Sequence, residues 1–140
     1  MKTNTLYLFD INAIIQHNDI NSTTNPFVIG FPEFLAKIGR DNIKILVPPN
    51  NIAQLPAIEA RLAELNISDK IAVLHTDRDL EHYINHSYAA NRYLFTYHFT
   101  IDEPHFKKPT ALIVIDKNND LLPPKNAVSV QNYKQISYLF

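Results

Sequence analysis

The stretch TLYLFDINAII, residues 5–15, decides how the fold is predicted. Its apolar run is interrupted by Asp10, and Asn12 follows two positions later. A nearly continuous apolar run of this length is typical of a strand buried on both faces in a parallel sheet. Because open α/β sheets place ligands at the carboxyl ends of their strands, we expect Asp10 to lie at a functional edge.

Segments with two different periodicities alternate along the rest of the chain. Short, apolar, β-branched segments predict further strands at 43–48, 70–75, 111–116 and 127–131. Apolar residues at helical spacing predict helices at 32–38, 52–66, 78–90 and 133–140. This order predicts a single domain over residues 1–140, built as a three-layer α/β/α sandwich with a mainly parallel five-stranded sheet and right-handed crossovers.

The ends of these elements carry their own signals. Pro32 in the first turn and Gly39 at the end frame one helix. Asn51 and Gln54 are predicted to cap the next one, unless Pro56 delays the start of that helix. Residues 16–31 are predicted as a loop, and residues 93–106 as an extra strand or hairpin.

Composition narrows the function classes. The chain has 140 residues, a net charge of −1, no cysteine and two glycines. Since no basic run exceeds Lys107-Lys108 and no apolar span is long, we expect neither general nucleic-acid binding nor a membrane segment. Two glycines are too few for a glycine-rich phosphate loop. Without cysteines or a signal-peptide pattern, we expect a cytoplasmic protein.

Acidic residues follow two of the predicted strands. Asp10 ends the first strand, Asp116 ends the fourth, and Asp120 follows four positions later. If the two strands are neighbours, these carboxylates converge and need a cation, and oxygen ligands favour Mg²⁺. The alternative is that each Asp only starts a turn.

Several motifs resemble those of the haloacid dehalogenase (HAD) superfamily. YLFDINAII is similar to its first motif, and LIVIDKNND is similar to its fourth. GFPEFLAKI looks like the helix before the second strand, ILVPPNN stands where the second motif belongs, and KKP stands where the motif-three lysine belongs. The resemblance spans nearly the whole chain and implies a HAD-like, Rossmann-like core, with little room at 16–30 for a cap domain. It also implies the strand order 5-4-1-2-3, in which the strand of Asp10 is adjacent to the strand of Asp116.

The resemblance implies a phosphatase-type site for a small phosphorylated substrate. Asp10 would be the nucleophile, Asn12 would stand at the acid/base position, and Asn50 would contact a phosphoryl oxygen. Lys107 or Lys108 would balance charge, with Lys108 the favoured residue.

A Mg²⁺ ion is implied by the same resemblance. Its ligands would be Asp10, the main-chain carbonyl of Asn12, and Asp116 or Asp120. Asn12 departs from the family pattern, because an amide cannot exchange a proton at a useful pKa. General acid–base catalysis contributes about 10²–10⁴-fold, so we expect weak or lost phosphatase activity.

Two alternatives stay open. LYLFDINAII also resembles the opening of PIN-domain ribonucleases, in which Asn12 would be the expected residue. That family's acidic residue on the following helix is absent here, with Gln54 nearest, and Asp77 or Asp79 would have to supply its third acid. The other alternative is a non-catalytic α/β scaffold that binds a protein partner through the aromatic segment 93–106.

Overall fold

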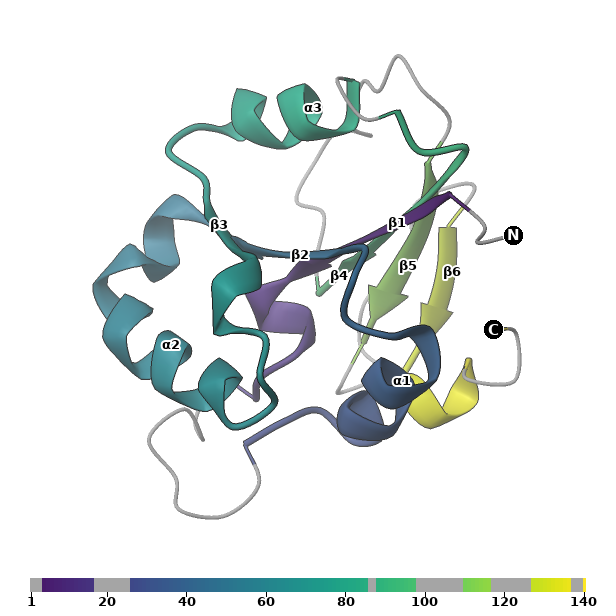
Figure 1. Ribbon diagram of the computed structural model, residues 1–140, viewed down its shortest axis with the longest axis horizontal. Helices are drawn as coiled ribbons and strands as arrows, with labels where there is room; N and C mark the ends of the chain where they lie inside the picture. Colours follow the sequence, from purple (N-terminus) through teal and green to yellow (C-terminus); the bar gives the residue numbers. More distant parts are fainter. Residues whose placement is uncertain (1–3, 17–25, 86–87, 98–109, 117–126, 137–139) are drawn as a thin grey trace.

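A computed structural model describes residues 4–16, 26–85, 88–97, 110–116, 127–136 and 140. Within these residues, strands pair in parallel in the order β3-β2-β1-β4-β5-β6 (Figure 1). The strands are β1 (Thr5–Asp10), β2 (Ile43–Val47), β3 (Ile71–Val73), β4 (Asn91–Thr96), β5 (Ala111–Ile115) and β6 (Ala127–Val130). The protein therefore has a parallel α/β sheet, as the alternating periodicity predicts.

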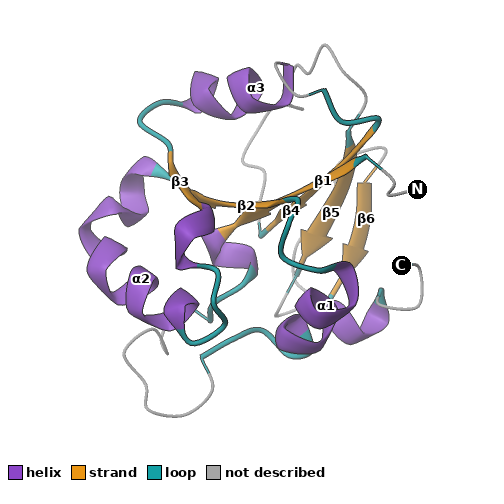
Figure 2. Ribbon diagram, viewed as in Figure 1, coloured by secondary structure: helices purple, strands orange, loops and turns teal. Residues whose placement is uncertain are grey.

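Helices cover both faces of this sheet. Helices α1 (Phe31–Ile38) and α2 (Leu55–Ala63) lie on one side, and α3 (Asp77–Asn85) lies on the other (Figure 2). Three short 3-10 helices among the described residues follow strands, namely η1 (Ile11–Ala13), η3 (Pro49–Gln54) and η5 (Tyr133–Gln135), and a fourth, η4 (Ser68–Lys70), lies between α2 and β3. Among the described residues, no helix is long and apolar enough to cross a membrane.

Alternation along β1 sends its side chains into two separate cores. Phe9 is fully buried in the core that includes Phe34 of α1. Leu8 is fully buried in the other core, beside Ile84 of α3. The first strand is thus buried on both faces, as its continuous apolar run predicts.

The expected five strands are present within two residues of their predicted ends, but the described sheet has six strands. The additional strand is β4, which falls at the start of the segment 93–106 that was predicted as a strand or hairpin. It is a central strand, although it contains the buried polar residues Arg92 and Thr96. Those two residues interrupt the apolar run, so the sequence does not identify β4 as a fully buried strand.

This additional strand overturns one expectation about the site. With the segment 111–116 counted as the fourth strand, the HAD-like order 5-4-1-2-3 places the strand of Asp10 beside the strand of Asp116. The observed order still contains 5-4-1-2-3, but its fourth strand is β4, and the strand of Asp116 is the fifth. In the structure β4 lies between β1 and β5, with Phe9 paired to Phe95 and Phe95 paired to Ile113. Because adjacent strands are about 4.8 Å apart, the axes of β1 and β5 are about 10 Å apart.

The predicted helix at 52–66 is also different in the structure. The chain first forms the 3-10 helix η3, and α2 begins at Leu55, next to Pro56. Gln54 is the residue before α2, and no side-chain hydrogen bond caps that helix, so the predicted Asn51–Gln54 cap is wrong. Pro56 lacks an N–H and is tolerated only in a first turn, which explains why the α-helix starts there.

Candidate functional site

Asp10 lies at the carboxyl end of β1, where the direction of strand addition reverses. From β1 the chain adds β2 and β3 on one side, then returns to add β4 on the other side of β1 (Figure 1). In open α/β sheets, this switch point at the carboxyl ends of the strands is where ligands bind. Asp10 is half-buried at this point, so its carboxylate remains partly accessible to solvent.

The Asp10 carboxylate is held by the residue two positions later. Its Oδ1 accepts the backbone N–H of Asn12 at 2.8 Å and the side-chain Nδ2 of Asn12 at 3.0 Å. Asp10 is therefore the N-cap of η1, and the turn that follows β1 is closed by its own carboxylate. Asp10 therefore both starts a turn and lies at the carboxyl edge of the sheet, where a ligand site is expected.

Asn12 joins Asp10 to the end of β2. Its Nδ2 also donates to Oδ1 of Asn51 at 3.0 Å, and Asn51 Nδ2 in turn donates to Oε1 of Gln54 at 3.1 Å. A side-chain amide nitrogen has two hydrogens, and Asn12 uses them on Asp10 and Asn51. The group formed by Asp10, Asn12, Asn51 and Gln54 is called the Asp10 site below.

Asn51 is the residue that sequence reasoning missed. It is 4% exposed and hydrogen-bonded to Asn12, whereas the expected Asn50 is exposed on η3. The ILVPPNN motif gave two adjacent candidates with the same side chain. The 3-10 turn after Pro48 decides between them, because the Asn51 N–H bonds to the Pro48 carbonyl at 2.9 Å and turns this side chain inward.

Asp116 is not part of the Asp10 site. It follows β5, is 2% exposed, and its N–H bonds to the Val130 carbonyl at 2.7 Å. Because β4 separates β5 from β1, the expected convergence of Asp10 and Asp116 on neighbouring strands is wrong. Asp120, Lys107 and Lys108 lie outside the described residues.

The expected Mg²⁺ ligands are therefore only partly brought together. Asp10 and Asn12 are adjacent, but Asp116 lies on a strand that is not next to β1. In the part of the chain that the structure describes, no three His, Cys, Asp or Glu side chains are grouped so as to hold a metal ion. The described residues alone do not complete the ligand set that the HAD resemblance implies, and Asp120, the alternative to Asp116 in that set, lies outside them.

Asp79, a candidate third acid of the PIN alternative, has another role. Its Oδ2 accepts the backbone N–H of His75 at 2.7 Å and that of Thr76 at 3.3 Å, at the start of α3. The hydrogen bond from His75 is the main reason that the pKa of Asp79 is lowered. Asp77 begins the same helix. This helix follows β3, which β2 separates from β1, so Asp79 lies away from the Asp10 site.

Tyr133 contacts the η1 turn that follows Asp10. Tyr133 of η5 is fully buried, and its hydroxyl donates to the Ala13 carbonyl at 2.8 Å. Burial, with a smaller contribution from the negative charge of Asp10, raises the pKa of Tyr133 well above its ordinary value. The hydroxyl is therefore protonated, and able to donate, over the whole neutral range.

Comparison with known proteins leaves the site to be judged on its geometry. No model of a known protein family matches the chain, and no curated protein matches it significantly. The resemblances to the HAD superfamily and to PIN-domain ribonucleases therefore remain hypotheses based on short motifs.

Proposed function

We propose that this protein is a HAD-like hydrolase core whose Asp10 site has weak or lost phosphatase activity. The position of Asp10 supports the proposal, because it is a half-buried carboxylate at the switch point of a parallel sheet. In this proposal Asp10 is the nucleophile toward a small phosphorylated substrate.

The single observation that carries the proposal is the environment of Asn12. In this proposal Asn12 stands at the acid/base position, and its Nδ2 lies 3.0 Å from Asp10 Oδ1. Both Nδ2 hydrogens are directed to protein acceptors, on Asp10 and Asn51. Asn12 thus orients the carboxylate but supplies no proton, and the loss of general acid–base catalysis predicts a rate lower by about 10²–10⁴-fold.

A PIN-like ribonuclease is the second candidate, and one observation favours it. Asn12 is a fully hydrogen-bonded member of the site, bridging β1 to the segment after β2, as a native motif residue would be. Gln54, at the place of that family's helix acid, accepts a hydrogen bond from Asn51. The site therefore has fewer acidic groups than the PIN-domain pattern requires, which weakens the ribonuclease candidate.

For the non-catalytic scaffold, only the first part of the segment expected to bind a partner is described. Tyr93, Leu94 and Phe95 belong to the central strand β4, and Leu94 and Phe95 are buried. Residues 98–106 of that segment lie outside the described residues. The scaffold remains the outcome in which no variant has activity.

Hydrolysis assays on three forms of the protein separate these candidates. The wild type, Asn12→Asp and Asp10→Asn are compared on p-nitrophenyl phosphate and on a single-stranded RNA, with Mg²⁺ and with EDTA. A HAD-like core predicts barely detectable phosphatase activity in the wild type, an increase of about 10²-fold in Asn12→Asp, and none in Asp10→Asn.

The other possible results of these assays support different candidates. Ribonuclease activity that Asn12→Asp leaves unchanged or lowers would support the PIN-like alternative. Absence of both activities in all three proteins would contradict both enzyme proposals and leave the scaffold. Equal rates with Mg²⁺ and EDTA would show that hydrolysis does not depend on the metal.

A further inference from the structure

One buried hydrogen bond joins η1, the turn that contains Asn12, to a residue 120 positions further along the chain. The Tyr133 hydroxyl donates to the carbonyl of Ala13, the last residue of η1. Ala13 is fully buried, so this carbonyl is out of reach of water. Asp10 caps the start of the same three-residue helix. The two ends of η1 are therefore fixed by side chains from different parts of the chain.

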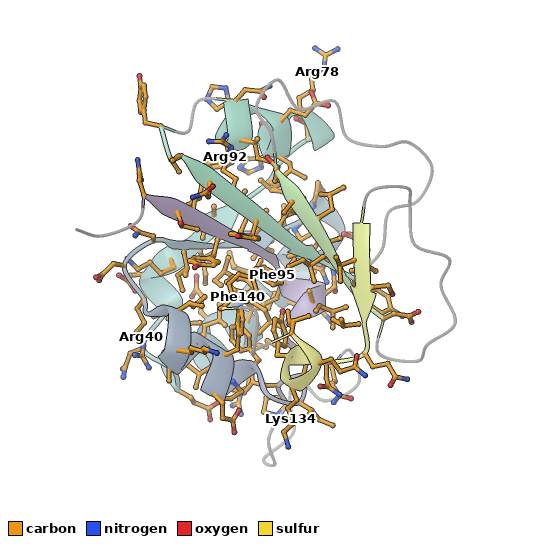
Figure 3. The ribbon with its side chains drawn as sticks, turned by 90° about the vertical axis from the view of Figure 1, so that its right-hand side faces the viewer. Arg40, Arg78, Arg92, Phe95, Lys134 and Phe140 are labelled. Atoms are coloured by element: carbon orange, nitrogen blue, oxygen red, sulfur yellow. The ribbon has the colours of Figure 1, made fainter. Side chains whose placement is uncertain are left out.

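Aromatic packing holds the Tyr133 ring in place. Its centroid lies 5.2 Å from that of Phe31, 5.3 Å from that of Phe34 and 5.9 Å from that of Phe95. Figure 3 shows Phe95 and Phe140 in the densely filled layer beside the sheet, and Lys134 on the outside of the η5 turn. A ring fixed on several sides has one position for its hydroxyl, so Tyr133 acts as a rigid support.

The backbone on both sides of Tyr133 is also fixed. Its N–H bonds to the Ile29 carbonyl at 3.0 Å. Gly30 has a φ of 83°, and a Cβ there would lie 2.9 Å from the backbone nitrogen of Lys134. This close approach requires glycine, which has no Cβ, so η5 packs directly against the segment that leads into α1.

From these contacts we infer that Tyr133 is a positioning residue for the Asp10 site, fixing η1 so that Asn12 keeps its hydrogen bonds to Asp10 and Asn51. The relevance of this role to catalysis rests on the proposed function. The hydrogen bonds that Tyr133 is inferred to maintain exist without any ligand. Removing the hydroxyl leaves the buried Ala13 carbonyl without this donor, and the η1 turn then opens more often.

Amide hydrogen exchange in Tyr133→Phe tests this role. The affected amides are those of Asn12, which bonds to Asp10, and of Ile14 and Ile15, which bond to the Ile11 carbonyl at 3.1 and 3.0 Å. We expect their protection to fall by about tenfold or more, while protection in β2 is retained. We also expect the side-chain amide resonances of Asn12 to shift.

Tyr93→Phe is the matched control. Tyr93 packs against the same core, and its ring stacks on Tyr7 with centroids 5.6 Å apart. Losing that hydroxyl should leave the amides of residues 12, 14 and 15 unchanged. An equal loss of protection in η1 and β2 of Tyr133→Phe would contradict the positioning role, because it would mean a general loss of core stability.

A measurement on the wild type covers the case in which Tyr133→Phe does not fold. If η1 opens only when the hydroxyl bond breaks, breaking that bond cannot cost more free energy than opening η1. After correction for intrinsic exchange rates, the opening free energy from exchange of the Tyr133 hydroxyl proton should therefore be no larger than that from the Ile14 amide. A larger value for the hydroxyl would contradict the inference, because η1 would then open with the bond still intact. Neither measurement involves a substrate or turnover, so failure of the positioning role is distinguishable from failure of the proposed phosphatase activity.

Discussion

The central residue of this site is an amide, in the position where the proposed hydrolase would need an acid. Asn12 donates to the Asp10 carboxylate and to Asn51, and so its neutrality is what allows the three side chains to lie within hydrogen-bond distance. A carboxylate at position 12 would face Asp10 across about the same distance, and like charges at such separations raise one of the two pKa values.

Asn12→Asp is therefore expected to be less stable at neutral pH, by about 1–3 kcal/mol. Because the folded-state pKa of one carboxyl is raised above its unfolded value, protonation favours the folded state. The destabilisation should be small near about pH 4 and should grow as the pH rises through that raised pKa. Urea unfolding at several pH values measures it, with the neutral variant Asn12→Ala as control. A deficit of Asn12→Asp that does not change with pH would contradict the proximity of the two carboxyls.

Asn51 and Asn50 give a matched pair for the side-chain network. Asn51→Ala removes the buried acceptor for Asn12 and should lower the free energy of unfolding by about 1–3 kcal/mol. Asn50→Ala, at an exposed position, should change it by less than about 0.5 kcal/mol. Urea unfolding of both variants measures the difference. Equal effects would mean that Asn51 does not join Asn12 to η3.

At the scale of elements, the start of α3 depends on one carboxylate. Asp79 accepts the N–H groups of His75 and Thr76, and its pKa is lowered chiefly by the His75 bond. A lowered folded-state pKa means that its stabilising effect is present above the unfolded pKa and is lost as the pH falls through the folded one. The cap is therefore intact at neutral pH.

Asp79→Ala should accordingly loosen the beginning of α3 without affecting the Asp10 site. We expect faster amide exchange at residues 75 and 76 and in the first turn of α3, while the amides of residues 12 and 14 stay protected. In the wild type, the same loosening should appear on acidification below the ordinary pKa of an aspartate. Unchanged exchange in Asp79→Ala at neutral pH would show that this cap does not hold the helix.

The elements also show what the sequence can and cannot predict. Five strands and three helices were predictable, because their apolar periodicity reflects burial on one or two faces. Strand β4 was only half recognised, since buried Arg92 and Thr96 interrupt its apolar run. Within the site, Asp10 was predictable from its place at a strand end. Asn51 was not, because the choice between it and Asn50 depends on the η3 turn.

For the whole molecule, the order of strands determines which residues can meet. The predicted neighbours Asp10 and Asp116 are separated because β4 takes the place beside β1. Which strands pair depends on contacts between segments that are distant in the sequence. The sequence of a short apolar strand does not specify its neighbour in the sheet. One strand not identified as central therefore separates two residues that were expected to lie on neighbouring strands.

Nuclear Overhauser contacts test this strand order in solution. The register pairs Leu8 of β1 with Leu94 of β4, and Leu94 with Leu112 of β5. Backbone contacts are expected between β1 and β4 and between β4 and β5. Direct backbone contacts between β1 and β5 would contradict the order and would restore the neighbouring arrangement of Asp10 and Asp116.

The central claim is that Asn12, lacking a titratable proton, limits hydrolysis at Asp10. The most direct test is the pH dependence of kcat/KM for p-nitrophenyl phosphate in Asn12→Asp and in the wild type, with Asp10→Asn/Asn12→Asp as the control for contaminating phosphatases. We predict that Asn12→Asp is faster by about 10²-fold and that its rate falls as the new acid loses its proton at higher pH, a limb that the wild type lacks. A rate equal to that of the wild type, or a faster rate without this limb, would contradict the claim.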